Sequence, residues 1–208
     1  MILIGQFDSP FVRRVAIAMR FYGLEFEHRP WSVFSDADKI GAINPMRRVP
    51  TLVLDDGEVL IESFAILDHL DEVAGRARAL IPESGSKRRQ ALKVCALGTG
   101  LAEKVVALIY ERALHETTSD MWVERCRCQI VEVLEALERD RATRRGPWWF
   151  GDGIGHADIG VACALRFVRE AHGDLFDAAR FPHLAAHSDA CEALPDFIEI
   201  SQAFDPPA

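Results

Sequence analysis

The sequence is poor in cysteine, and its few cysteines are not spaced for redox or metal chemistry. Five cysteines occur in 208 residues, none forms a C-x-x-C pair, and the first of them is Cys95. An odd number of sparse cysteines favours reduced thiols over a disulfide framework. Cys126 and Cys128 lie two residues apart in a helical pattern, so they point to different faces of the helix. We therefore expect no metal site.

The chain also lacks a basic excess and any long hydrophobic run. It carries 24 lysines and arginines against 32 aspartates and glutamates, and residues 1–80 already hold 9 basic and 12 acidic side chains. A surface that attracts nucleic acid is therefore not expected. No apolar run approaches the roughly 18 residues of a membrane span. Since no basic region precedes the short apolar start, we expect no signal peptide, no membrane partner and a cytoplasmic protein.

What the sequence does contain is a proline-marked turn followed by a β-hairpin, in residues 44–63 (N-P-M-R-R-V-P-T-L-V-L-D-D-G-E-V-L-I-E-S). Pro50 cannot donate to a strand ladder, so we expect it at the entrance of a strand. The turn around Gly57 then returns the chain as an antiparallel strand. Ser63 stands directly before an apolar helical repeat, so we predict that Ser63 is the N-cap of a helix over residues 63–74.

The residues before the hairpin have the order of a parallel βαβ unit. Residues 1–4 indicate a short buried strand, and Ser9 followed by Pro10 predicts a helix that ends at Gly23. The next strand is expected within residues 24–31 and a short helix from Ser35 to about Ile43. A βαβ unit followed by a helix, a hairpin and a helix is typical of an α/β thioredoxin-like domain, which we place at residues 1–76.

The second part of the chain changes character. Residues 77–86 hold turn-forming residues and no long repeat, so we interpret them as a linker. Long helical repeats then predict an all-α helical-bundle domain over residues 87–208. Within it, Ile154-Gly155-His156-Ala157-Asp158 begins a buried helix, and we expect Asp158 to hydrogen-bond back to the amide of Gly155. Both residues are interpreted as structural.

As an ordered set, Asn44-Pro45, Val49-Pro50 and Glu62-Ser63 resemble the glutathione-binding signature of the cytosolic glutathione S-transferase superfamily. The resemblance covers nearly the whole chain and implies the same two-domain fold. It also implies a cis bond before Pro50, pairing of the Val49 backbone with the cysteinyl unit of glutathione, and binding of the γ-glutamyl group by Glu62 and Ser63. A carboxylate suits the ammonium group, and a hydroxyl with helix amides suits the carboxylate. Arg48 is expected to bind the glycyl carboxylate. The helix cap departs from the superfamily pattern, because the usual Ser or Thr is replaced by Gly155.

Ser9 is the expected thiol-activating residue. Residues 9–13 resemble the S/C-P-x-x-R motif, which implies that the Ser9 hydroxyl donates to the glutathione sulfur. Glutathione reacts as its thiolate, and both a hydroxyl donor and a helix N-terminus favour the anion. Asp8 is a complication, because a carboxylate close to the sulfur opposes ionisation unless it points away.

The second substrate is expected to be a small apolar electrophile bound between the domains. The sequence offers several apolar side chains for this pocket: Phe11, Trp31, Phe34, Leu101, Val105 and Tyr110. Glutathione is the co-substrate, and no cofactor is expected. The resemblance further implies a homodimer, with helix 63–74 and the first helix of the bundle at the interface.

Our leading prediction is a glutathione S-transferase with a role in detoxification, and three alternatives stay open. A glutathione-dependent isomerase, dehalogenase or lyase would share the thiolate and differ in the second pocket. A thiol reductase of the cysteine type would need a resolving thiol near residue 9, where the sequence has none. A non-catalytic binding or regulatory protein would keep the fold without activating the thiol.

Overall fold

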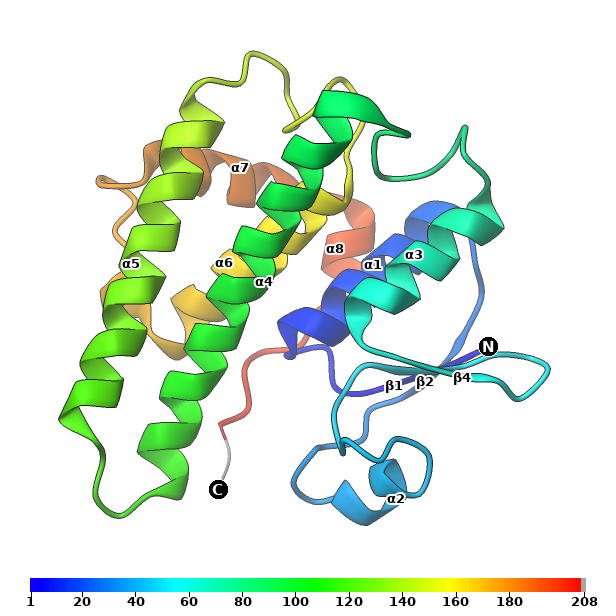
Figure 1. The fold of residues 1–208 in the computed structure, drawn as a ribbon, viewed down its shortest axis with the longest axis horizontal. Helices are drawn as coiled ribbons and strands as arrows, with labels where there is room; N and C mark the ends of the chain where they lie inside the picture. Colours follow the sequence, from blue (N-terminus) through cyan, green and yellow to red (C-terminus); the bar gives the residue numbers. More distant parts are fainter. Residues whose placement is uncertain (207–208) are drawn as a thin grey trace.

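The computed structural model describes residues 1–206. Its first domain contains a four-stranded mixed sheet together with helices α1, α2 and α3 (Figure 1). The strand order is β2-β1-β3-β4; β1 pairs parallel with β2, whereas β3 pairs antiparallel with both β1 and β4. This is the predicted thioredoxin-like arrangement, so the prediction for this domain is confirmed. Its elements in chain order are β1 (Ile2–Ile4), α1 (Pro10–Tyr22), β2 (Glu27–Arg29), α2 (Ala37–Gly41), β3 (Thr51–Val53), β4 (Val59–Ile61) and α3 (Ser63–Ala74).

Helix α1 begins and ends where the sequence predicts. The Ser9 hydroxyl oxygen accepts the N–H of Val12 at 3.5 Å, and Pro10 is the first helical residue. At the other end Gly23 takes a left-handed conformation, with φ of 68°, and its N–H bonds to carbonyls of the last turn. Because the caps at both ends are local, the pattern of the sequence was sufficient to predict them.

Helix α3 begins differently from the prediction, and the assignment of Ser63 as its N-cap is wrong. The N-cap is Glu62, which has a left-handed backbone with φ of 67° and makes no side-chain cap bond. Ser63 is the first helical residue and is buried. Its hydroxyl oxygen accepts a hydrogen bond from Arg14 Nη2 at 2.6 Å. A buried guanidinium from another helix therefore takes the serine side chain that would otherwise cap α3.

The second domain is helical, as predicted, and its core lies between α4, α5, α6 and α7. Helix α4 begins two residues before the predicted start of the domain at residue 87. No helix within residues 1–206 is both long and apolar enough to cross a membrane. The elements are α4 (Gly85–Leu114), α5 (Asp120–Ala142), α6 (His156–Ala171), the 3₁₀ turn η1 (Gly173–Leu175), α7 (Pro182–Glu192) and α8 (Pro195–Glu199).

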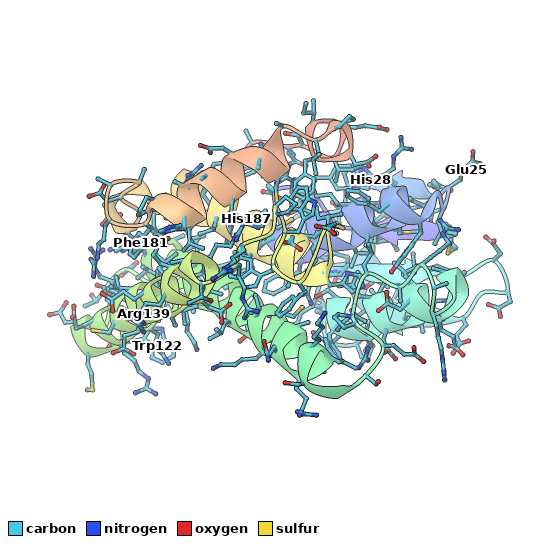
Figure 2. All side chains as sticks on the ribbon, turned by 90° about the horizontal axis from the view of Figure 1, so that it is seen from above. Glu25, His28, Trp122, Arg139, Phe181 and His187 are labelled. Carbon is cyan, nitrogen blue, oxygen red and sulfur yellow. The ribbon has the colours of Figure 1, made fainter. Side chains whose placement is uncertain are left out.

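The end of the chain packs back on the first domain. Helices α6 and α8 both contact α1, and Ile159, Phe197 and Ile200 share one apolar core with residues of α1 and the sheet. In Figure 2, His28 lies toward the sheet-bearing end of the molecule and Phe181 at the helical end, with His187 between them. Helix α6 is consequently buried between α1 of the first domain and the other helices of the second domain, which explains why it carries little polar surface.

The start of α6 has the predicted hydrogen bond, and the structure explains why glycine stands at its cap. Asp158 Oδ2 accepts the N–H of Gly155 at 2.9 Å, and Oδ1 accepts the N–H of Trp149 at 2.8 Å. Burial raises the pKa of Asp158 to about 6, opposed by these bonds. A Cβ at Gly155 would lie 2.8 Å from the carbonyl oxygen of Leu80. That carbonyl accepts the N–H of His156. The segment before α4 therefore lies too close to the start of α6 for a side chain at residue 155.

Gly155→Ser is therefore expected to destabilise the protein, although serine is the more usual N-cap. The hydroxyl gains only a few tenths of a kcal/mol over glycine, whereas the clash with the Leu80 carbonyl costs about 1–3 kcal/mol. Urea unfolding measures the difference. Gly153→Ser is the matched control, because a Cβ there meets nothing within 4 Å. A Gly155→Ser variant as stable as wild type would show that the Leu80 contact does not exclude a side chain.

Candidate functional site

Ser9 lies at the start of α1, on the loop that follows β1. It is partly exposed, and its oxygen accepts only the long bond from Val12. Within residues 1–206 its O–H donates to no acceptor, so the proton is available for a ligand atom. The first amides of α1 and the helix dipole face the same place, and both favour a negative charge there.

The loop before Pro50 is brought against the start of α1 by Gly5. The Val49–Pro50 bond is cis, as the resemblance implies. A Cβ at Gly5 would lie 2.5 Å from Val12 Cγ2 and 2.8 Å from Val49 Cβ, so only glycine lets these side chains approach. Within residues 1–206 neither the N–H nor the C=O of Val49 has a hydrogen-bond partner. Such a free backbone edge can pair with an extended peptide.

Asn44 holds the turn that presents Val49. It is buried; Nδ2 donates to the carbonyl of Arg48 at 2.9 Å and to Thr51 Oγ1 at 3.0 Å. Its Oδ1 accepts the N–H of Met46 at 3.0 Å. In the sequence Asn44 is recognisable only as one member of the motif, with no role of its own. Its three bonds identify it as the residue that sets the shape of this turn.

Glu62 and Ser63 follow β4 directly, but the Glu62 side chain is exposed and the Ser63 side chain is buried. The Glu62 carboxylate is about half exposed and lies 3.7 Å from Arg48 Nη1, whose side chain is 72% exposed. An exposed ion pair of this kind contributes little, so both groups stay available to a ligand. Ser63 is buried at the first turn of α3, where the free amides of a helix N-terminus lie.

Arg14 is a site residue that no motif in the sequence identifies. Its guanidinium is buried and donates to Ser63 Oγ at 2.6 Å and to Thr99 Oγ1 at 2.9 Å. Within residues 1–206 it forms no ion pair, and its Nε has no hydrogen-bond partner. Burial lowers the pKa of Arg14, yet an arginine stays charged in proteins. A buried cation therefore lies behind Ser63; the charges of Glu62 and Glu103 favour its charged form, and no sequence pattern indicates it.

The carboxylate of Asp8 is directed toward the C-terminal tail. Its Oδ2 accepts the N–H of Asp205 at 3.2 Å, and the neighbouring N–H of Phe7 donates to Gln202 Oε1 at 3.1 Å. Burial raises the pKa of Asp8, with the charge of Asp205 adding to the effect and backbone N–H groups opposing it. The loop before α1 thus contacts the C-terminal tail beside Ser9, which the sequence pattern did not indicate.

Two of the predicted pocket aromatics meet across the domain boundary. Phe34, which precedes α2, and Tyr110 of α4 make an edge-to-face contact with ring centroids 5.5 Å apart. They are 45% and 37% exposed, so an apolar surface faces solvent there. Burial raises the pKa of Tyr110; the charge of Arg48 opposes this and that of Asp8 adds to it. The same open surface is therefore close to both charged residues.

The other predicted pocket residues are distributed differently. Phe11 is half-buried against the core of the helical domain, and Trp31 lies under the cations of Arg29 and Lys39. Leu101 and Val105 are fully buried within that core and offer no surface to a ligand, so their assignment to the pocket is wrong. The helical repeat predicted their inward direction but could not show whether a cavity or other side chains lie there.

Two family models match the chain. Residues 3–78 match the glutathione S-transferase N-terminal domain, and residues 120–190 match the glutathione S-transferase C-terminal domain. Among relatives, an uncharacterized GST-like protein of Escherichia coli is 27% identical over 189 residues, which are 88% of this chain and 89% of that protein. A maleylacetoacetate isomerase of Pseudomonas aeruginosa is 28% identical over 202 residues, which are 93% and 92% of the two chains.

Solved structures give the same result at the level of the fold. A glutathione S-transferase from Methylobacterium radiotolerans, in complex with glutathione sulfonate, is 29% identical with a TM-score of 0.89, covering 100% of this chain and 98% of the other. A glutathione transferase family member from Pseudomonas fluorescens with bound glutathione is also 29% identical, with a TM-score of 0.82, covering 100% and 99%. The likeness therefore extends over both domains.

Proposed function

This chain belongs to the cytosolic glutathione S-transferase superfamily, and from that premise we propose that it binds glutathione, ionises the thiol at Ser9 and joins the sulfur to a small apolar electrophile. The observation that carries the proposal is the Ser9 hydroxyl, which has an uncommitted proton at the N-terminus of α1 beside the open backbone edge of Val49. A thiolate needs a donor and a positive electrostatic environment, and this position offers both.

In the proposed complex, glutathione lies along the edge before Pro50. Its cysteinyl unit pairs with the N–H and C=O of Val49, which extends the sheet by one strand-like segment. The γ-glutamyl ammonium group binds Glu62, and its carboxylate binds the hydroxyl of Ser63 and the first amides of α3. Arg48 exchanges its exposed contact with Glu62 for the glycyl carboxylate.

The chemical step then needs a lower thiol pKa. A free thiol has a pKa of about 8.5, and a decrease of two units requires about 2.7 kcal/mol of preference for the anion. The Ser9 hydroxyl supplies a hydrogen bond to the sulfur, and α1 supplies its dipole. The thiol proton leaves to solvent, the sulfur electron pair attacks the electrophile, and the leaving group departs with its bonding pair. The reaction uses glutathione as co-substrate and no cofactor or metal.

The open aromatic surface of Phe34 and Tyr110 is the proposed electrophile site, and we include Phe11, which is half-buried against the core of the helical domain. These side chains come from both domains, and together they are apolar, as such a site requires. Charged neighbours at Asp8 and Arg48 border the surface. The electrophile is therefore expected to have an apolar body, with any polar group directed to this border.

We also propose the homodimer implied by the resemblance, with α3 and α4 at its interface. A hollow lies between these two helices, lined by Arg14, Phe64, Leu67, Asp68, Asp71, Ile81, Arg88, Leu92, Cys95 and His156. At its edge Phe64 is 59% exposed, so a large apolar side chain is open to a partner there. The cytoplasmic location and the role in detoxification stay predictions.

A glutathione-dependent isomerase is the second candidate, because a maleylacetoacetate isomerase aligns with 93% of this chain. Such an enzyme would use the same thiolate, add it to an unsaturated substrate and release it unchanged. The two activities differ only in the second substrate. A panel of alkyl and aryl halides beside unsaturated dicarboxylic acids separates them, because only transfer consumes glutathione.

Glutathione bound to the wild-type protein is expected to titrate about two units below free glutathione, at a pKa near 6.5. The ultraviolet absorbance of the thiolate follows this titration, and S-methylglutathione, which has no thiol, gives the baseline. A bound thiol that titrates like the free one would contradict the proposed activation. It would instead favour a binding or regulatory protein with the same fold.

A further inference from the structure

The C-terminal tail, residues 201–206, lies outside any helix or strand; in Figure 1 it passes the start of α1 and then runs away from the sheet. Gln202 contacts both domains: its side-chain oxygen accepts the N–H of Phe7, and its carbonyl accepts Arg166 Nη2 at 3.4 Å. The N–H of Phe204 donates to Glu170 at 2.8 Å, and its ring packs edge-to-face on Phe167. The tail is therefore attached to α6 on one side and to the Ser9 loop on the other.

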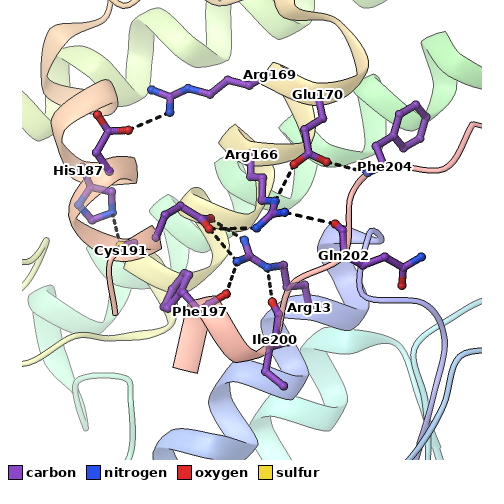
Figure 3. Close-up of polar contacts among 12 residues, drawn as sticks. Arg13, Arg166, Arg169, Glu170, His187, Cys191, Phe197, Ile200, Gln202 and Phe204 are labelled. Atoms are coloured by element: carbon purple, nitrogen blue, oxygen red, sulfur yellow. Dashed lines mark hydrogen bonds and ion pairs between the residues drawn. The ribbon is translucent and has the colours of Figure 1, made fainter. Parts of the chain in front are cut away.

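A network of charged side chains holds this tail in place (Figure 3). Arg13, one turn after Ser9, donates to both oxygens of Glu192 at 2.6 and 2.8 Å. It also donates to the carbonyls of Phe197 and Ile200, directly before the tail. Arg166 then links Glu192 to Glu170, which accepts the tail amide. Since Arg13 is buried and fully paired, the start of α1 and the start of the tail have one fixed relative position.

Ser9 itself is the N-cap of α1, where its carbonyl accepts the N–H of Arg13 at 2.9 Å, and the loop before it has few other supports. Within residues 1–206 the Phe7 N–H has Gln202 as its hydrogen-bond partner, and the Ser9 N–H makes only a 3.3 Å bond to the Gln6 carbonyl. The ring of Phe7 stacks on His28 at 3.7 Å, which holds the side chain but not the peptide plane. The Asp8 carboxylate accepts the N–H of Asp205 in the tail at 3.2 Å; burial raises the pKa of Asp8, and the backbone N–H groups of Asp205, Ser9 and Asp8 together oppose this rise.

We propose that Gln202 is a positioning residue for Ser9, and that the tail from Gln202 to Asp205 holds the Phe7–Ser9 loop with the Asp8 carboxylate turned toward the tail. This inference rests on the proposed function, because it assigns the tail a role in placing the thiol activator. Without the Gln202 bond the Phe7 peptide can rotate, which moves the Ser9 hydroxyl. It also releases Asp8, and a carboxylate nearer the sulfur opposes its ionisation.

Gln202→Met tests the proposal, because methionine has a similar length and no strong acceptor. We expect faster hydrogen exchange at the Phe7 amide, a higher pKa for bound glutathione and a kcat about three to ten times lower, with the affinity for glutathione within about twofold. Gln202→Glu keeps an acceptor oxygen and is expected to restore slow exchange at Phe7. Ser201→Ala, at an exposed neighbour without a side-chain hydrogen bond, is the matched control and should behave as wild type.

The outcomes separate this proposal from the proposed function. Unchanged Phe7 exchange in Gln202→Met, or an unchanged pKa of bound glutathione, overturns the positioning role and leaves thiol activation by Ser9 intact. If wild-type protein binds glutathione without lowering its thiol pKa, both proposals are overturned. The melting temperature is measured for each variant, and loss of thiol activation accompanied by a general loss of exchange protection across α1 would also overturn a specific role for Gln202.

Discussion

Replacing Ser9 by alanine is expected to lower kcat by about 100-fold, while the affinity for glutathione changes by less than about threefold. The hydroxyl donates to a sulfur that gains its charge only on ionisation, so its loss affects the anion more than the bound thiol. The contacts proposed for binding, at Val49, Glu62 and Ser63, do not involve Ser9. Initial rates with an aryl halide, together with calorimetric binding of glutathione, measure the two effects separately.

The stability of the Ser9→Ala variant has to be measured together with its activity, because Ser9 also caps α1. Loss of an N-cap costs about 1 kcal/mol, which does not unfold a protein of ordinary stability. Ser9→Thr is the matched control, since threonine keeps both the hydroxyl and the capping oxygen, and it should retain most of the activity. A fully active Ser9→Ala protein would refute the assigned role, whatever its stability.

Gly5→Ala is expected to cost at least about 3 kcal/mol of unfolding free energy and to abolish most glutathione binding. Gly5 has φ of 127°, a conformation that alanine rarely adopts, and its Cβ would collide with Val12 and Val49 at 2.5 and 2.8 Å. Relief of these clashes must move the loop before Pro50 away from α1. Binding is lost with it, because the proposed peptide edge and the Ser9 hydroxyl then no longer face the same ligand.

Gly57→Ala separates the effect of backbone strain at positive φ from the effect of the steric clash at Gly5. Gly57 in the hairpin turn also has positive φ, 91°, but a Cβ there meets nothing within 4 Å. Its substitution should cost only about 1 kcal/mol and leave glutathione affinity unchanged. Urea unfolding and calorimetry on both variants are sufficient. Equal losses in the two variants would show that backbone strain, and not the approach of Val49 to α1, governs the effect at Gly5.

Much of the fold could be predicted because its signals are short-range. The start of α1 at Ser9-Pro10, its end at Gly23 and the hairpin around Gly57 each depend on residues within a few positions of one another. The bond from Asp158 to the Gly155 amide spans three residues and was predicted for the same reason. Local preference and local structure agree at these places, so the pattern alone is informative.

The candidate site was predictable only as a set of residues. The motif placed Ser9, Val49 and Glu62 in one region. The helical repeat after Ser63 misassigned that residue as a cap, and the expected pocket between the domains misassigned Leu101 and Val105. Each of these errors arose because the sequence does not show which residues a side chain contacts in the folded protein. Ser63 faces Arg14 from another helix, and the two aliphatic residues face the packed centre of the bundle.

The amino-acid sequence by itself determined the order of the elements, the caps of α1 and the identity of the residues that resemble a glutathione site, because these follow from backbone preference and short spacing. Only the tertiary structure decided that Arg14 lies behind Ser63, that Leu80 excludes a side chain at Gly155, and that Gln202 reaches the Ser9 loop from 195 positions away. Such contacts join segments that are far apart in the sequence, and this sequence separation does not indicate how close the segments lie in space. They arise when the whole chain buries its apolar faces and its buried polar groups must find partners wherever the packing places them.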